Sequence, residues 1–122
     1  MKGYGLFLIL FLILAPAAAF SDTEEIFRDL TVVGSEVFTY RCDDGKIIAR
    51  YYRLSDGSLP FVRLLFPDGR EYTLPQILSA SGARYTDEAE LVWWIKGEEA
   101  FVEVRDDDGQ WVTLYESCRL EP

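Results

Sequence analysis

The stretch that decides the fold is residues 37–74, VFTYRCDDGKIIARYYRLSDGSLPFVRLLFPDGREYTL, in which Asp-Gly pairs recur every twelve residues. The pairs are Asp44-Gly45, Asp56-Gly57 and Asp68-Gly69, and a fourth follows at Asp108-Gly109. Asp-Gly is a strong hairpin signal because both residues tolerate the positive φ of a type I′ turn. Turns at this regular spacing are typical of an antiparallel β-meander.

The segments between these turns have the composition of strands. In residues 37–42 the side chains of Phe38, Tyr40 and Cys42 share one face, since successive strand side chains point to opposite sides. The other predicted strands are residues 61–66, 70–74 (ended by Pro75), 90–96, 100–105 and 111–118. In residues 61–66, Val62, Leu64 and Phe66 share a face. Closing such a sheet removes its exposed edges, so we predict a small all-β domain, an antiparallel β-barrel.

The first nineteen residues have the three parts of a secretory signal peptide. Lys2 supplies the positive charge, residues 6–14 form an apolar run, and residues 15–19 are Ala-Pro-Ala-Ala-Ala. The run is too short to span a bilayer of about 30 Å comfortably. We therefore predict cleavage after Ala19 and export as a soluble protein without a membrane anchor. An acidic leader over residues 20–36 would then precede the barrel domain, residues 37–122.

The acidic charge of the chain is compatible with a basic protein as partner, and an acidic excess is also a common route to solubility. The net charge is −9, and it becomes −10 once the predicted signal peptide is removed. Such a surface repels nucleic acid and anionic lipid and attracts basic proteins over long range.

The residue types present argue against an enzyme. The chain has no His, the commonest general base and metal ligand. The acids at residues 43–44 and 106–108 stand at predicted turns, where Asp bonds its own backbone rather than holding calcium or acting in catalysis. We therefore expect no catalytic residues, no metal and no cofactor.

Cys42 and Cys118 are the two cysteines of the chain, and both fall in the part predicted to be exported. An even count in an oxidising compartment argues for a disulfide rather than two free thiols. Cys42 ends the first clear strand and Cys118 ends the last, so a bridge would join the two ends of the meander. Closing so long a loop contributes about 4 kcal/mol to stability in the chain-entropy model.

Two motifs in the second half of the chain identify a family. They consist of Ser81-Gly82-x-x-Tyr85, within the run SASGARYTD at residues 79–87, and Trp94-x-Lys96-Gly97-x-x-Ala100. Together they resemble the signature of the bacterial C-type lysozyme inhibitors, the membrane-bound and periplasmic proteins that protect the cell wall from host lysozyme. The resemblance covers residues 37–118 and includes both cysteines.

The resemblance implies an eight-stranded barrel and a periplasmic inhibitor of C-type lysozyme. Members of this family plug the lysozyme cleft with a loop serine and a hairpin lysine, which map onto Ser81 and Lys96. Lysozyme uses two carboxyl groups, one protonated and one ionised. An ammonium beside the ionised group and a hydroxyl bonded to the other would occupy both.

Five further residues have expected supporting roles under this resemblance. Arg84 is expected at the rim of the lysozyme contact. Tyr85 and Trp94 are expected to fix the loop and the hairpin. Gly82 and Gly97 are expected to permit tight backbone shapes there.

The chain departs from the family pattern in two respects. It has no lipobox cysteine, so it resembles the periplasmic branch rather than the lipid-anchored one. Residues 86–93 form a slightly longer segment than the pattern, which would shift Lys96 relative to Ser81. Such a shift would alter affinity and lysozyme preference more than the fold.

A different class of function is also compatible with the sequence. Trp93, Trp94 and Trp111 could line the interior of a small-ligand carrier, with an apolar molecule inside the barrel. Small barrels of about eight strands are usually filled by their own side chains or hold one small ligand. A third possibility is a structural envelope module without inhibitory activity.

Overall fold

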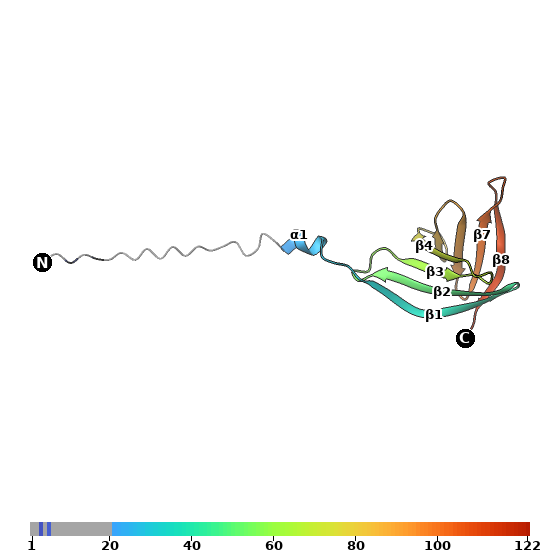
Figure 1. Ribbon diagram of the computed structural model, residues 1–122, viewed down its shortest axis with the longest axis horizontal. Coiled ribbons are helices and arrows are strands. Elements are labelled where there is room, and N and C mark those ends of the chain that lie inside the picture. The colour runs from blue at the N-terminus through green and yellow to red at the C-terminus, as the bar shows by residue number, and fades with distance from the viewer. Residues whose placement is uncertain (1–2, 4, 6–20) are drawn as a thin grey trace.

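Eight antiparallel strands form a closed barrel in the computed structural model, which describes residues 3, 5 and 21–122 (Figure 1). Each strand pairs with its neighbours in chain order, and β8 closes the barrel against β1. The strands are β1 (Val32–Cys42), β2 (Gly45–Leu54), β3 (Phe61–Leu65), β4 (Glu71–Ile77), β5 (Ala83–Thr86), β6 (Leu91–Lys96), β7 (Glu99–Arg105) and β8 (Trp111–Leu120). The predicted all-β barrel is therefore confirmed.

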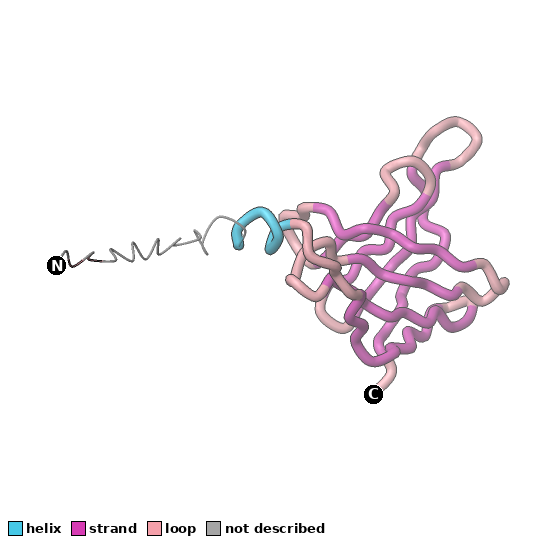
Figure 2. Tube along the Cα trace, turned by 60° about the vertical axis from the view of Figure 1, so that its left-hand side comes forward, coloured by secondary structure: helices cyan, strands magenta, loops and turns pink. Residues whose placement is uncertain are grey.

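One short helix, α1 (Ser21–Ile26), lies outside the barrel at the end where β1 begins (Figure 2). The chain enters β1 through Thr31, whose N–H donates to Ser55 Oγ at 3.1 Å and whose carbonyl accepts from the Ser55 N–H at 2.8 Å. Residues 1–19, the predicted signal peptide, lie outside the described residues except for Gly3 and Gly5. In the described part of the chain, no helix has the length and apolar character needed to cross a membrane.

The observed strands differ from the predicted ones most in β1, in β4 and in two strands that were not predicted. Strand β1 begins at Val32, within the predicted leader, and accommodates a register shift between Gly34 and Val37. Strand β4 does not end at Pro75: this residue pairs with Phe61, and the next N–H, of Gln76, donates to the Pro60 carbonyl at 2.9 Å. Strands β2 and β5 were absent from the prediction, since neither has a regular alternation of apolar and polar residues.

Three of the four Asp-Gly pairs form hairpin loops as predicted, but not of type I′; at the remaining pair, Asp43-Asp44 make the turn and Gly45 already begins β2. The Gly57 N–H donates to the Leu54 carbonyl, and the Leu54 N–H donates to the Ser58 carbonyl, both at 2.8 Å. With Gly57 alone at positive φ, this is a three-residue loop made of a type I turn and a glycine bulge. The Asp56 carboxylate accepts the Ser58 N–H at 2.9 Å, which stabilises the ordinary negative φ at the aspartate. The loops at Gly69 and Gly109 repeat the backbone pattern.

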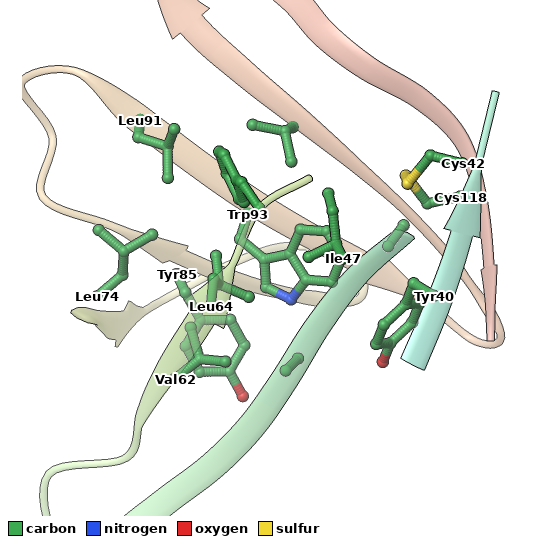
Figure 3. Packing of buried hydrophobic residues seen from close by; sticks show 14 residues of the cluster. Tyr40, Cys42, Ile47, Val62, Leu64, Leu74, Tyr85, Leu91, Trp93 and Cys118 are labelled. Carbon is green, nitrogen blue, oxygen red and sulfur yellow. A yellow bond between two sulfur atoms is a disulfide. The ribbon is translucent and has the colours of Figure 1, made fainter. Parts of the chain in front are cut away.

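Side chains of the barrel fill its interior (Figure 3). Trp93 is fully buried and packs edge-on against Tyr40, with ring centroids 5.0 Å apart. The Trp93 Nε1 donates to the Tyr51 hydroxyl at 3.2 Å, and the hydroxyls of Tyr51 and Tyr40 are 3.0 Å apart. Burial raises the pKa of both phenols, so they stay neutral. The faces predicted for Tyr40, Cys42 and the strand after Pro60 are the buried ones.

The three tryptophans do not line a common cavity, in contrast to the ligand-carrier hypothesis. Trp93 is inside the barrel, whereas Trp94 lies on the outer face beneath Lys96. Trp111 is 37% exposed at the start of β8, with the Arg105 guanidinium over its ring. Trp94 cannot line the interior together with Trp93, because adjacent residues in a strand face opposite sides of the sheet.

The predicted disulfide joins Cys42 and Cys118, with an S–S distance of 2.03 Å. It lies at the seam of the barrel, where β1 and β8 share the register pairs Tyr40↔Leu120 and Arg41↔Arg119. Figure 3 shows the bond beside the core cluster. Because the seam ladder is short and the closed loop spans 76 residues, the bridge supports closure of the barrel and contributes about 4 kcal/mol.

Candidate functional site

Two loops at one end of the barrel carry the serine and the lysine singled out by the motifs. The serine loop, residues 78–82, connects β4 to β5, and the lysine hairpin, residues 96–99, connects β6 to β7. Strands β5 and β6 pair with Ala83 opposite Ile95 and Arg84 opposite Trp94. The start of β5 therefore adjoins the end of β6, which places the two loops side by side.

The indole of Trp94 connects the serine loop to the lysine hairpin. Its Nε1 donates to the Ser81 carbonyl at 3.0 Å, and the Ser79 hydroxyl donates to the same oxygen at 2.6 Å. The Lys96 ammonium lies 4.4 Å from the centre of the Trp94 ring. A cation over an indole face is worth about 0.5–1 kcal/mol at an exposed site. One side chain thus orients both the loop and the lysine.

Gly82 brings the serine loop into direct contact with the backbone of β6. Its φ is +64°, in the left-handed region that favours glycine. A Cβ built on Gly82 would lie 2.1 Å from the Ile95 carbonyl oxygen and 2.9 Å from Lys96 Cγ. Because the main clash is with backbone, no rotamer change can relieve it, and the close approach of the two loops requires glycine.

The lysine hairpin has a two-residue turn, Gly97-Glu98, between the register partners Lys96 and Glu99. Gly97 has a φ of +63° at the first central position, the feature of a type II′ turn. Gly97 differs from Gly82 because the space around it is open. The backbone conformation at Gly97 favours glycine, but no neighbouring atom excludes a side chain there.

Arg84 and Phe101 flank Trp94 on the two neighbouring strands. The Arg84 guanidinium lies 4.9 Å from the centre of the Trp94 ring, and its Nε is buried without a hydrogen-bond partner among the described residues. The Phe101 ring lies 5.4 Å from that of Trp94. Sequence reasoning missed Phe101, although a two-residue turn at 97–98 already fixes it as the cross-strand partner of Trp94.

Tyr85 supports the site from the opposite face of the sheet. It is 7% exposed and points into the barrel, where its ring is 5.5 Å from that of Tyr51. Burial, and then the neighbouring Tyr40, raise the pKa of the Tyr85 phenol, which therefore stays neutral. Of the motif residues, the structure brings Ser81, Gly82, Arg84, Trp94 and Lys96 together on one surface and leaves Tyr85 beneath it.

The loop that joins β5 to β6 falls within residues 86–93, the segment predicted to be longer than the family pattern, and it lies away from the site. Strands β5 and β6 remain in register from Ala83 to Thr86, and the loop that joins them lies at the other end of the barrel. There the Asp87 carboxylate accepts the N–H groups of Ala89, Glu90 and Leu91. Burial opposes ionisation of Asp87, but these three donors outweigh it and hold the pKa of the carboxyl below its ordinary value. Arg84 is paired with Trp94 in this register, so the β5–β6 loop takes no part in the contact between the serine loop and the lysine hairpin.

The site presents positive charge and hydrogen-bond donors on an aromatic surface. Ser81 and Lys96 are exposed, and within the described residues Lys96 has no ion pair. The chain as a whole carries a net charge of −9. At this end of the barrel the cations Lys96 and Arg84 stand beside the exposed carboxylates Glu98 and Glu99 of the same hairpin. Such a surface suits a partner that is basic overall and has acidic groups in a cleft.

Comparisons with known proteins point to one family. The family model described as "MliC: Membrane-bound lysozyme-inhibitor of c-type lysozyme" matches residues 40–111. The membrane-bound lysozyme inhibitor of C-type lysozyme from Yersinia enterocolitica is 36% identical over 86 residues, 70% of this chain and 64% of that protein. The protein of the same name from Pseudomonas aeruginosa is 37% identical over 62 residues, 50% of this chain and 46% of the relative. The chain thus spans between about half and just under two thirds of these relatives.

A solved structure shares the fold. The crystal structure of Pseudomonas aeruginosa MliC in complex with hen egg white lysozyme superposes with a TM-score of 0.54 at 26% sequence identity. The superposition covers 76% of this chain and 87% of the MliC chain. This barrel therefore shares its fold with a protein that has been crystallised with a lysozyme.

Proposed function

Because this chain belongs to the family of membrane-bound lysozyme inhibitors of C-type lysozyme, we propose that it inhibits a C-type lysozyme by occluding the active-site cleft. The observation that carries the proposal is the joint fixation of the serine loop and the lysine hairpin by Trp94. Preorganised loops lose little conformational freedom on binding, so more of the contact energy appears as affinity.

The proposed contact uses Ser81 and Lys96 at the two catalytic carboxyl groups of lysozyme. One of these groups is kept protonated as the acid, and the other is ionised. The Lys96 ammonium would pair with the ionised carboxylate, and the Ser81 hydroxyl would bond to the protonated group. Arg84, over the Trp94 ring, would contribute at the rim. Neither contact needs a cofactor, since inhibition results from occupancy of the lysozyme cleft alone.

The distribution of charge supports the same partner. C-type lysozymes are basic, and a chain of net charge −9 attracts them over long range. At short range the Lys96 ammonium would meet the acidic cleft. Complementary potentials of this kind raise the association rate and fix the orientation of the complex.

We also propose that the mature protein is soluble in the periplasm, although its relatives are named membrane-bound. A lipid anchor requires a cysteine near the start of the mature chain. Cys42 ends strand β1 and is bonded to Cys118, so its sulfur is not free to carry a lipid. Export through the predicted signal peptide would place residues 20–122 in an oxidising compartment suited to that bond.

Titration of a C-type lysozyme with the mature protein tests the proposed function. The rate of lysis of a cell-wall suspension is expected to fall linearly with added protein and to reach zero near one molar equivalent of protein per lysozyme. A sample with the disulfide reduced and alkylated serves as the control for a folded inhibitor. Undiminished lysis at large excess of the intact protein would contradict the proposal and favour a structural envelope module.

A further inference from the structure

We propose that Arg119 is a positioning residue that keeps Lys96 available to its partner by holding the carboxylate of Glu99. The expected effect on binding rests on the proposed function, whereas the contacts themselves are present in the free protein. It concerns three residues in one row across strands β6, β7 and β8: Lys96, Glu99 and Arg119.

The register places a carboxylate directly beside the lysine. Glu99 is the cross-strand partner of Lys96 on β7, and Arg119 is the partner of Glu99 on β8. Directly opposed residues have Cβ atoms about 4.5–5.5 Å apart, so a Lys96–Glu99 ion pair lies within reach of both side chains. The row therefore offers Glu99 two cations, one on either side.

The structure resolves this choice in favour of Arg119. Its guanidinium donates to Glu99 Oε1 at 2.8 Å, whereas the Lys96 ammonium is directed onto the ring of Trp94 at 4.4 Å. Lys96 is thus free of its nearest carboxylate. Both side chains of the Arg119–Glu99 pair are more than 60% exposed, so the pair adds little to stability, and its consequence lies in where it leaves Lys96.

Loss of Arg119 would impair binding in two ways. The released Glu99 carboxylate would compete with the lysozyme carboxylate for Lys96. It would also place an unneutralised negative charge beside the catalytic carboxylates, and like charges brought together in an interface are costly. We expect Arg119→Ala to weaken inhibition about tenfold.

A set of four variants separates this role from other effects of charge. Glu99→Gln removes the competing carboxylate, so Arg119→Ala combined with Glu99→Gln should recover affinity to within about twofold of Glu99→Gln alone. Arg41→Ala is the matched control: it removes the same charge at the next position of the row, where Arg41 pairs with Glu121 instead. This control should bind lysozyme about as tightly as the unmodified protein.

The free protein supplies a readout that does not involve lysozyme. The Trp94 ring current shifts the NMR signals of the Lys96 ε-methylene upfield while the ammonium lies over the ring. In Arg119→Ala these signals should move toward ordinary lysine positions, and in the double variant they should return. Arg41→Ala should leave them in place.

The outcomes are distinct. Unchanged ε-methylene signals in Arg119→Ala would overturn the inference even if lysozyme were never inhibited. A loss of affinity in Arg119→Ala that Glu99→Gln does not rescue would also overturn the inference, because it would indicate direct contact between Arg119 and lysozyme. An equal loss of affinity in Arg41→Ala would overturn it too, because it would indicate an effect of net charge. Absence of inhibition by the unmodified protein would instead contradict the proposed function.

Discussion

Replacing Lys96 by alanine is expected to weaken inhibition of C-type lysozyme by about 2–5 kcal/mol, roughly 30-fold to a few thousandfold in Kd. Much of this loss would come from the partner, because its ionised carboxylate stays buried in the interface without a counter-charge. The folded protein should be little affected. Lys96 is exposed and contributes a cation–π contact with Trp94, worth about 0.5–1 kcal/mol.

Lys46→Ala is the matched control for this measurement. Lys46 is the other lysine of the barrel, half-exposed and paired with Glu121 on a different part of the surface. Its removal changes the net charge by the same amount and therefore has the same long-range effect on a basic partner. Equal inhibition constants for Lys96→Ala, Lys46→Ala and the unmodified protein would contradict the role proposed for Lys96.

Gly82→Ala is expected to lower the free energy of unfolding by about 2–4 kcal/mol and to weaken inhibition at least tenfold. The left-handed φ costs alanine about 1–2 kcal/mol, and the clash with the Ile95 carbonyl adds a comparable amount. Relief of the clash requires the serine loop to move away from β6. That movement would break the Trp94–Ser81 hydrogen bond and separate Ser81 from Lys96.

Gly109→Ala is the control for Gly82→Ala, because it introduces the same backbone strain at positive φ without a clash with a neighbouring strand. Gly109 has a φ of +77° in the loop between β7 and β8, and a Cβ there meets open space. This control should lose about 1–2 kcal/mol in urea unfolding while its inhibition constant stays unchanged. If Gly82→Ala lost only as much stability as Gly109→Ala and kept its inhibition constant, close contact between the serine loop and β6 would not be needed for inhibition.

Much of the fold could be predicted from local sequence. The Asp-Gly spacing predicted the meander, and alternation around Tyr40 and in residues 61–66 predicted the faces that are buried. The two cysteines at the ends of the meander predicted the bridge. These features depend on short-range rules, namely turn chemistry and the two-residue period of a strand.

The missed elements depend on interactions between distant segments. Strand β5 has four residues and follows Gly82, so its own propensity is weak, and it is defined by pairing with β4 and β6. Strand β4 passes through Pro75 because the Gln76 N–H carries the ladder to β3, and the pairing of β4 with β5 includes Gln76 and Ile77 but not Pro75. Tertiary context outweighed local propensity in both strands.

The candidate site was predicted in its residue types but not in its construction. The motifs named Ser81, Lys96 and Trp94, yet nothing in the sequence indicated that the indole holds the Ser81 carbonyl and the lysine together. The adjacent pairs Trp94–Phe101 and Glu99–Arg119 follow from the register across β6, β7 and β8. That register could be derived for the two-residue hairpin, but not across β7 and β8, where it shifts between Ala100 and Glu103.

Competition between the protein and a substrate oligosaccharide tests occlusion of the cleft most directly. The apparent Kd for lysozyme would be measured by calorimetry at increasing concentrations of a non-hydrolysable cell-wall oligosaccharide. We predict that the apparent Kd rises in proportion to oligosaccharide concentration once the cleft is saturated, because both ligands require the same carboxyl groups. An apparent Kd that stays constant while the cleft is filled would show that the protein binds elsewhere, and would contradict the proposed roles of Ser81 and Lys96.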